Sequence, residues 1–137
     1  MVNSKAVRQA LYTALNVKAV TQLLGSGSAS ICHAVAPSSA AYPLVIFNKQ
    51  SSQSQPSFGG DRLDSELWLV KAVVQGGSSS AAEDVAAAVD GVLHWKTLAI
   101  TGGESLHLAR ESGLDFSEIQ DGEQYRHHGS VYRLIIH

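Results

Sequence analysis

The sequence contains a single cysteine, and it contains no long run of apolar residues. Cys32 has no second cysteine with which to form an intramolecular disulfide or a thiolate zinc cluster. The chain is therefore compatible with a reducing cytoplasm. No apolar stretch approaches the roughly 20 residues that a membrane-spanning helix requires, so we expect no membrane contact.

Acidic residues are missing from the first 60 positions of the 137-residue chain. This part has four Lys and Arg residues and no Asp or Glu, for +4, whereas the remainder has six basic and twelve acidic residues, for −6. The division favours head-to-tail contact between copies or docking on another protein, and chance is the alternative. With ten basic residues and a pI near 6.3, the chain lacks the basic patch typical of nucleic-acid-binding proteins.

Motifs for nucleotide binding and serine hydrolysis are absent as well. The stretch GSGSAS at residues 25–30 lacks the last glycine of a nucleophile elbow, and no Gly-Lys-Ser/Thr follows it as in a P-loop. His127 and His128 are adjacent in a predicted strand, so their side chains point to opposite faces and would not bind one metal ion together. We therefore expect no catalytic residues, no cofactor and no metal ion.

Acidic residues are concentrated in one stretch of the second half. They are Glu111, Asp115, Glu118, Asp121 and Glu123. Their spacing does not match a calcium-binding loop. A solvated face is the simplest interpretation, and a docking or lumen-lining surface is the next.

The periodicity of apolar residues predicts two principal helices and a short one. Ser4 is a candidate N-cap for a helix with an apolar stripe over residues 6–15, and a short helix follows at residues 17–24. The clearest helix runs from Ser80 to Leu93, where Ser80 and Glu83 form a capping box. Its alanines permit close approach to a sheet.

Two predicted strands are apolar on both faces. One begins at Tyr42 in the sequence AAYPLVIFNKQSSQSQ (residues 40–55), and the other covers residues 65–74. The Ser- and Gln-rich segment between them contains Gly59-Gly60, and we interpret it as a long hairpin extension. Shorter strands are predicted at residues 30–35, 95–101, 104–110, 114–119 and 125–137.

This order of elements predicts a single α+β domain over residues 1–137. Two principal helices would pack on one face of a mainly antiparallel sheet, with the hairpin extending from it. Because the helices cover only one face, apolar residues on the other face need cover from another subunit.

The pattern also resembles a known protein family. The elements that carry the resemblance are ALYTALN and AVTQLLG, the strand start YPLVIF, the strand ELWLV, the helix SAAEDVAAAVDGVL and the closing strand GSVYRLII. Together they resemble the tail-completion or tail-terminator proteins of long-tailed (siphovirus-like) double-stranded DNA phages and prophage-like particles. The resemblance covers most of residues 6–137.

The resemblance implies a virion structural protein and no enzyme activity. Such a protein is assembled in the host cytoplasm into a homo-oligomeric ring, a hexamer, at the head-proximal end of the tail tube. It stops tube polymerisation and joins the tail to a neck or head-completion protein. DNA passes through the lumen of the ring without specific binding.

Two groups of residues are candidates for roles in this ring. We expect the hairpin extension and its surroundings to supply the subunit interface, through Gln53, Gln55, Phe58, Arg62 and Trp68. We expect the acidic residues Glu111, Asp115, Glu118, Asp121 and Glu123 to line the lumen or the neck-facing rim, where they would repel DNA phosphates.

Two other functions stay open at this point. The first is a head-tail connector (neck) ring subunit, because such proteins are also small ring-formers. The second is a small α+β enzyme or ligand-binding module that uses the acidic stretch, with His107 and Asp115 as its test residues.

Overall fold

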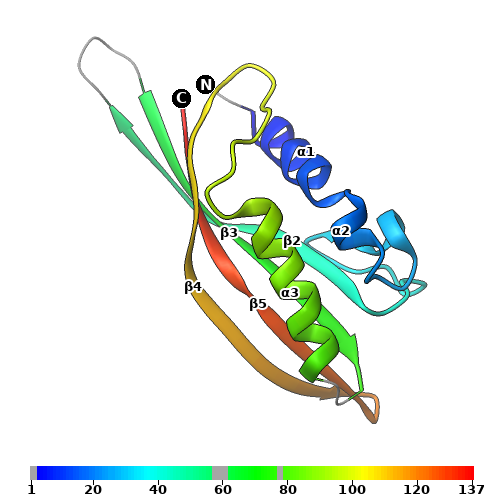
Figure 1. Ribbon diagram of the computed structural model, residues 1–137. Helices are drawn as coiled ribbons and strands as arrows, with labels where there is room; N and C mark the ends of the chain where they lie inside the picture. The colour runs from blue at the N-terminus through cyan, green and yellow to red at the C-terminus, as the bar shows by residue number, and fades with distance from the viewer. Residues whose placement is uncertain (1–2, 57–61, 77–78) are drawn as a thin grey trace.

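The computed structural model describes residues 3–56, 62–76 and 79–137 (Figure 1). In chain order its elements are α1 (Ser4–Leu15), α2 (Lys18–Thr21), the 3-10 helix η1 (Gly27–Ser30), β1 (Ile31–His33), β2 (Leu44–Pro56), β3 (Arg62–Gln75), α3 (Ser79–Leu93), β4 (Ser105–Gln120) and β5 (Glu123–Ile136). The predicted α+β fold class is confirmed.

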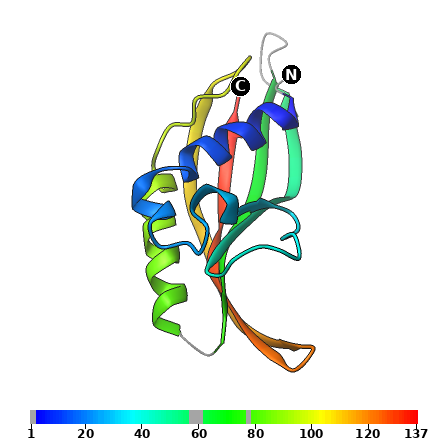
Figure 2. The same ribbon diagram turned by 90° about the vertical axis from the view of Figure 1, so that its right-hand side faces the viewer.

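Five strands form one sheet in the order β1-β2-β3-β5-β4. The three-residue strand β1 is parallel to β2, and the other pairs are antiparallel. Helices α1 and α3 lie on the same side of the sheet, as the two views show (Figures 1 and 2). The other side has no helix among the described residues.

The core lies between the two helices and this side of the sheet. Helix α1 contributes Val7, Leu11 and Leu15, whose spacing by four residues places them on one stripe. From the sheet, Trp68 and Tyr132 are the largest fully buried side chains. The N-cap of α1 is Asn3, whose Oδ1 accepts a 2.7 Å hydrogen bond from the backbone N–H of Lys5, so the expectation that Ser4 caps this helix is wrong.

Three strand predictions differ from the structure. No strand forms at residues 95–101: Leu98 and Ile100 are buried, but the segment pairs with no strand. The two strands predicted at 104–110 and 114–119 are parts of one strand, β4, which has a register shift between Arg110 and Ser112. Residues 51–56, expected as part of a loop-like extension, are the second half of β2 and pair with residues 62–67 of β3.

A partly buried hydrogen bond joins α3 to the sheet. The Tyr132 hydroxyl donates to Asp90 Oδ1 over 2.9 Å. Burial, followed by this hydrogen bond, raises the pKa of Tyr132 well above the ordinary tyrosine value. Because the fold favours the neutral phenol, this stabilisation is complete below the unfolded tyrosine pKa of about 10 and is lost as the pH rises above it.

Of the four tyrosines, Tyr132 is expected to ionise at the highest pH, and Tyr132→Phe removes this group. Absorbance titration at 295 nm should therefore lose its most alkaline component, and the free energy of unfolding at neutral pH should fall by about 1 kcal/mol. The exposed Tyr12 supplies the control, since Tyr12→Phe should leave that component in place. An unchanged alkaline end of the titration in Tyr132→Phe would contradict the assignment.

Candidate functional site

The face of the sheet opposite the helices, here called the open face, carries a row of apolar side chains. Strand alternation and register place them on the central strands: Asn48, Leu69 and Val131 are cross-strand neighbours, as are Ser65 and Ile135. The half-buried members of the row are Ile46, Leu67, Leu69, Val131 and Ile135. At one end of the same face, the paired residues Leu44 and Val73 are buried. Sheet faces of this kind pack well against a second layer.

Aromatic and charged groups cluster at one end of the open face. The His127 ring stacks on Phe116 with centroids 4.4 Å apart, and His127 Nε2 lies 2.7 Å from Glu118 Oε1. Lys71 Nζ lies 5.4 Å from the centre of the Phe116 ring, and burial lowers the Lys71 pKa while Glu118 partly offsets the effect. The buried His127 Nδ1 has no hydrogen-bond partner among the described residues.

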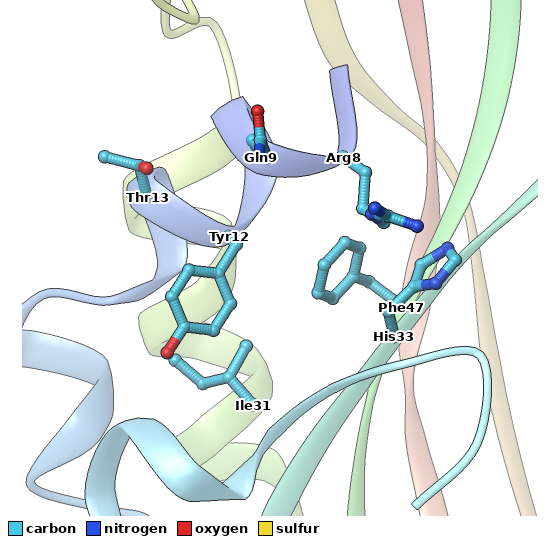
Figure 3. Close-up of a pocket in the computed structure, with 7 residues that line it drawn as sticks. All are labelled: Arg8, Gln9, Tyr12, Thr13, Ile31, His33 and Phe47. Atoms are coloured by element: carbon cyan, nitrogen blue, oxygen red, sulfur yellow. The ribbon is translucent and has the colours of Figure 1, made fainter. Parts of the chain in front are cut away.

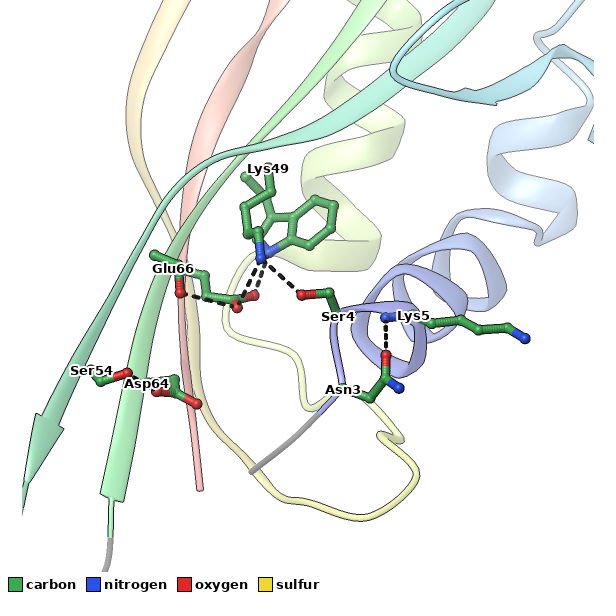
Figure 4. Close-up of polar contacts among 9 residues, drawn as sticks. Asn3, Ser4, Lys5, Lys49, Ser54, Asp64 and Glu66 are labelled. Carbon is green, nitrogen blue, oxygen red and sulfur yellow. Dashed lines mark hydrogen bonds and ion pairs between the residues drawn. The ribbon is translucent and has the colours of Figure 1, made fainter.

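The hairpin formed by β2 and β3 is stabilised by side chains on its helix-facing side. Ser54 donates a 2.7 Å hydrogen bond to Asp64 Oδ1. Glu66 accepts a 2.9 Å hydrogen bond from Trp68 Nε1 and lies 3.6 Å from Lys49 Nζ, which also donates to Ser4 Oγ (Figure 4). The hairpin is thus joined to the start of α1.

The structure brings only some of the expected interface residues to the surface. Gln53 is exposed on β2, and the backbones of Gln55 and Arg62 belong to the paired strands. Phe58 lies outside the described residues. Trp68 is 2% exposed and lies in the core beneath the helices, so its side chain contributes no surface to a partner.

Three of the five acidic candidates contact side chains on β5. Glu111 pairs with Arg133 at 3.1 Å and Asp115 with Arg126 at 2.9 Å, whereas Glu118 contacts His127, which carries a charge only when it is protonated. The other two, Asp121 and Glu123, are exposed at the β4–β5 turn and have no ion-pair partner among the described residues. Unpaired acidic charge is therefore concentrated at the tip of this hairpin.

A groove lies between α1 and the edge of the sheet formed by β1 and β2. Its larger pocket has a volume of about 540 Å³ and is lined by Arg8, Gln9, Tyr12, Thr13, Ile31, His33 and Phe47 (Figure 3). A neighbouring pocket of about 380 Å³ shares Arg8 and His33 and adds Lys5 and Lys49. Burial, followed by the charge of Arg8, lowers the pKa of His33, so the positive charge of the groove comes from its Lys and Arg residues.

Sequence reasoning did not identify this groove. Arg8 and Tyr12 lie four residues apart on α1, which places them on one face of the helix, beside the apolar stripe. That spacing was the available signal. The pairing of β1 with β2, which brings Ile31 and Phe47 opposite α1, depends on the tertiary structure.

The two residues of the enzyme hypothesis lie far apart. Asp115 lies eight positions after His107 on β4, which at about 3.3 Å per residue places their Cα atoms roughly 25 Å apart. His107 packs edge-on against Trp95, whereas Asp115 pairs with Arg126. No group of three or more His, Cys, Asp or Glu side chains suited to a metal ion occurs in the described part of the chain.

Among the described residues, no helix combines the length and apolar character needed to cross a bilayer.

The fold itself has relatives among solved structures. A chain from the virion of a native gene transfer agent particle has a TM-score of 0.76 at 17% identity, with 97% of this chain and 96% of that chain covered. A second solved chain has a TM-score of 0.59 at 16% identity, with coverages of 98% and 96%. At these identities the matches show a shared fold.

No curated protein sequence matches the chain. The family profile described as "Tail completion protein gp17" matches residues 6–137, which is nearly the whole chain and the range over which the resemblance was expected. The chain belongs to the tail completion protein gp17 family, and its role is a structural one in the tail of a phage-like virion.

Proposed function

We propose that this protein is a tail terminator, which forms a closed homo-oligomeric ring at the head-proximal end of the tail tube. The ring stops polymerisation of the tube protein and presents a surface to the neck or head-completion protein. The whole chain acts as one domain in this role. No step of it requires catalysis or a cofactor.

The open face of the sheet is the observation that carries the proposal. Its apolar row lies on the central strands, and no helix among the described residues covers it. A structural protein gains stability by burying such a surface against another subunit, at about 25 cal/mol per Å² of apolar area. A neighbouring copy or a tube subunit supplies that cover in the assembled tail.

The acidic residues fit the DNA-repelling role less uniformly than the sequence suggested. Carboxylates paired with Arg126 and Arg133 add little net negative potential, because each ion pair is close to neutral at a distance. Repulsion of phosphate by the lumen would then depend on the unpaired carboxylates and on the net charge of −2. Interface roles for Gln53, Gln55, Phe58 and Arg62 remain part of the proposal.

The test is a tube-polymerisation assay with purified tube protein. We expect one ring equivalent per tube end to halt elongation and narrow the distribution of tube lengths seen in electron micrographs. Leu69→Gln, on the open face, should weaken this effect, whereas Glu83→Gln, on the exposed side of α3, should preserve it. Tubes that grow past the added protein at an unchanged rate would overturn the proposal, and binding to necks alone would favour a connector.

A further inference from the structure

The groove between α1 and the β1–β2 edge has an apolar floor and a cationic rim. Ile31, Tyr12 and Phe47 supply the apolar surface, and Figure 3 shows the Arg8 guanidinium beside His33 at the mouth. Arg8 makes no hydrogen bond or ion pair with any described residue, and neither does the ammonium group of the nearby Lys5. A ligand for this groove therefore needs one apolar group and at least one negative charge.

The β4–β5 hairpin tip of the same protein has this combination. Ile119 is 79% exposed, and it is followed by a two-residue turn in which Asp121 and Gly122 both have positive φ values of 53° and 79°. Such a turn makes a narrow, rigid hairpin end. Asp121 lies in the turn and Glu123 directly follows it. Both carboxylates lie within four residues of Ile119 and have no ion-pair partner among the described residues.

The tip and the groove lie too far apart to meet within one molecule. The tip extends beyond the end of α3, while α1 lies at the opposite end of the molecule in both views (Figures 1 and 2). Contact between them therefore requires two molecules. The charge asymmetry of the sequence matches this arrangement. The groove belongs to the first 60 residues, which contain no acidic residue, and the tip belongs to the acidic remainder.

We propose that the β4–β5 hairpin tip of one copy docks into the α1–β1 groove of the next copy, with Ile119 on the apolar floor and the tip carboxylates facing Arg8 and Lys5. The inference rests on the proposed ring and specifies one of its contacts. Because the two surfaces differ, the contact is heterologous, and contacts of this kind form a ring when the rotation that relates the copies closes. The tip is negatively charged and the groove is positively charged. Like charges would therefore meet in tip-to-tip and groove-to-groove pairs, which disfavours both.

Disulfide trapping between two single-cysteine variants tests the contact directly. In a Cys32→Ser background, one variant carries Gln120→Cys at the tip and the other carries Thr13→Cys on the rim of the groove; both positions are exposed. Under mild oxidation in the presence of tube protein, we expect the mixture to form a cross-linked heterodimer at least tenfold faster than either variant forms a homodimer. Equal rates would overturn the inference.

Substitutions in the contact give a second measurement. Ile119→Asp and Arg8→Glu should each lower the heterodimer cross-linking rate about tenfold, which corresponds to about 1.4 kcal/mol. Pairing Arg8→Glu on one variant with Glu123→Lys on the other should restore it. Leu106→Asp, an exposed apolar residue at the opposite end of β4, is the matched control and should leave the rate unchanged.

These measurements test the tip–groove contact separately from the proposed terminator function. If Ile119→Asp and Arg8→Glu terminate tubes as the unmodified sequence does and cross-link as fast as the parent pair of single-cysteine variants, the docking inference is wrong and the terminator proposal stands. If the unmodified sequence terminates no tubes while the mixture still cross-links at its groove and tip, the terminator proposal fails and the docking inference stands.

Discussion

Trp68→Ala is expected to lower the free energy of unfolding by about 3 to 5 kcal/mol, the range for deleting a large aromatic side chain from a core. Trp68 is 2% exposed and lies between β2 and β5, opposite Lys49 and Tyr132. Its removal leaves a cavity beneath α1. It also removes the Nε1–H donor that Glu66 accepts from, which leaves a buried carboxylate with one partner fewer.

Urea denaturation followed by far-ultraviolet circular dichroism measures this effect without depending on tryptophan fluorescence. The second tryptophan provides a matched control, because Trp95 is 68% exposed and Trp95→Ala should change the free energy of unfolding by less than about 0.5 kcal/mol. Equal effects of the two substitutions would show that Trp68 does not occupy the core.

Gly129→Ala is expected to destabilise the fold by at least the 1 to 3 kcal/mol typical of overpacking. A Cβ at this position would meet the backbone carbonyl oxygen of Val70 and the Cα of Lys71 on β3, so both contacts involve backbone that does not yield easily. β5 would have to move away from β3 at the centre of the sheet. Thermal unfolding by circular dichroism should show the loss as a lower midpoint.

Gly91→Ala is the matched control for this substitution. Gly91 lies on the exposed side of α3, and an added Cβ there meets nothing within 4 Å. Because alanine favours a helix more than glycine does, Gly91→Ala should stabilise the protein by about 0.5 to 1 kcal/mol. If Gly129→Ala unfolds at or above the midpoint of the unmodified sequence, the close approach of β5 and β3 is incorrect.

Periodic apolar residues predicted the elements that contribute most to the core. The stripe of α3 and the alternation of β3 were sufficient to predict both elements and the α+β class. The strand predicted at residues 95–101 was wrong although Leu98 and Ile100 are buried, because side-chain burial does not require the backbone to pair. In this segment the backbone N–H of Trp95 donates to Leu108 of β4 without extending the sheet.

Backbone pairing also explains why the composition of β2 did not predict its second half as a strand. Ser51 to Ser54 have polar side chains with no periodic signal, yet each pairs with a residue of β3. The same limit applies to the candidate site. Alternation placed Trp68 on one face of its strand, but only the packing of α1 and α3 shows that this face is the covered one. The groove residues come from α1, β1 and β2, whose proximity no local pattern encodes.

Hydroxyl-radical footprinting of the open face tests the central claim, that another subunit covers this face in the tail. Modification of Leu67, Leu69 and Val131 would be compared between the free protein and the protein assembled on tubes, with buried Trp68 as the control for an intact fold. We predict that modification of the three open-face residues falls several-fold on assembly while that of Trp68 stays low in both states. Equal modification of these residues in the free and assembled protein would contradict the account.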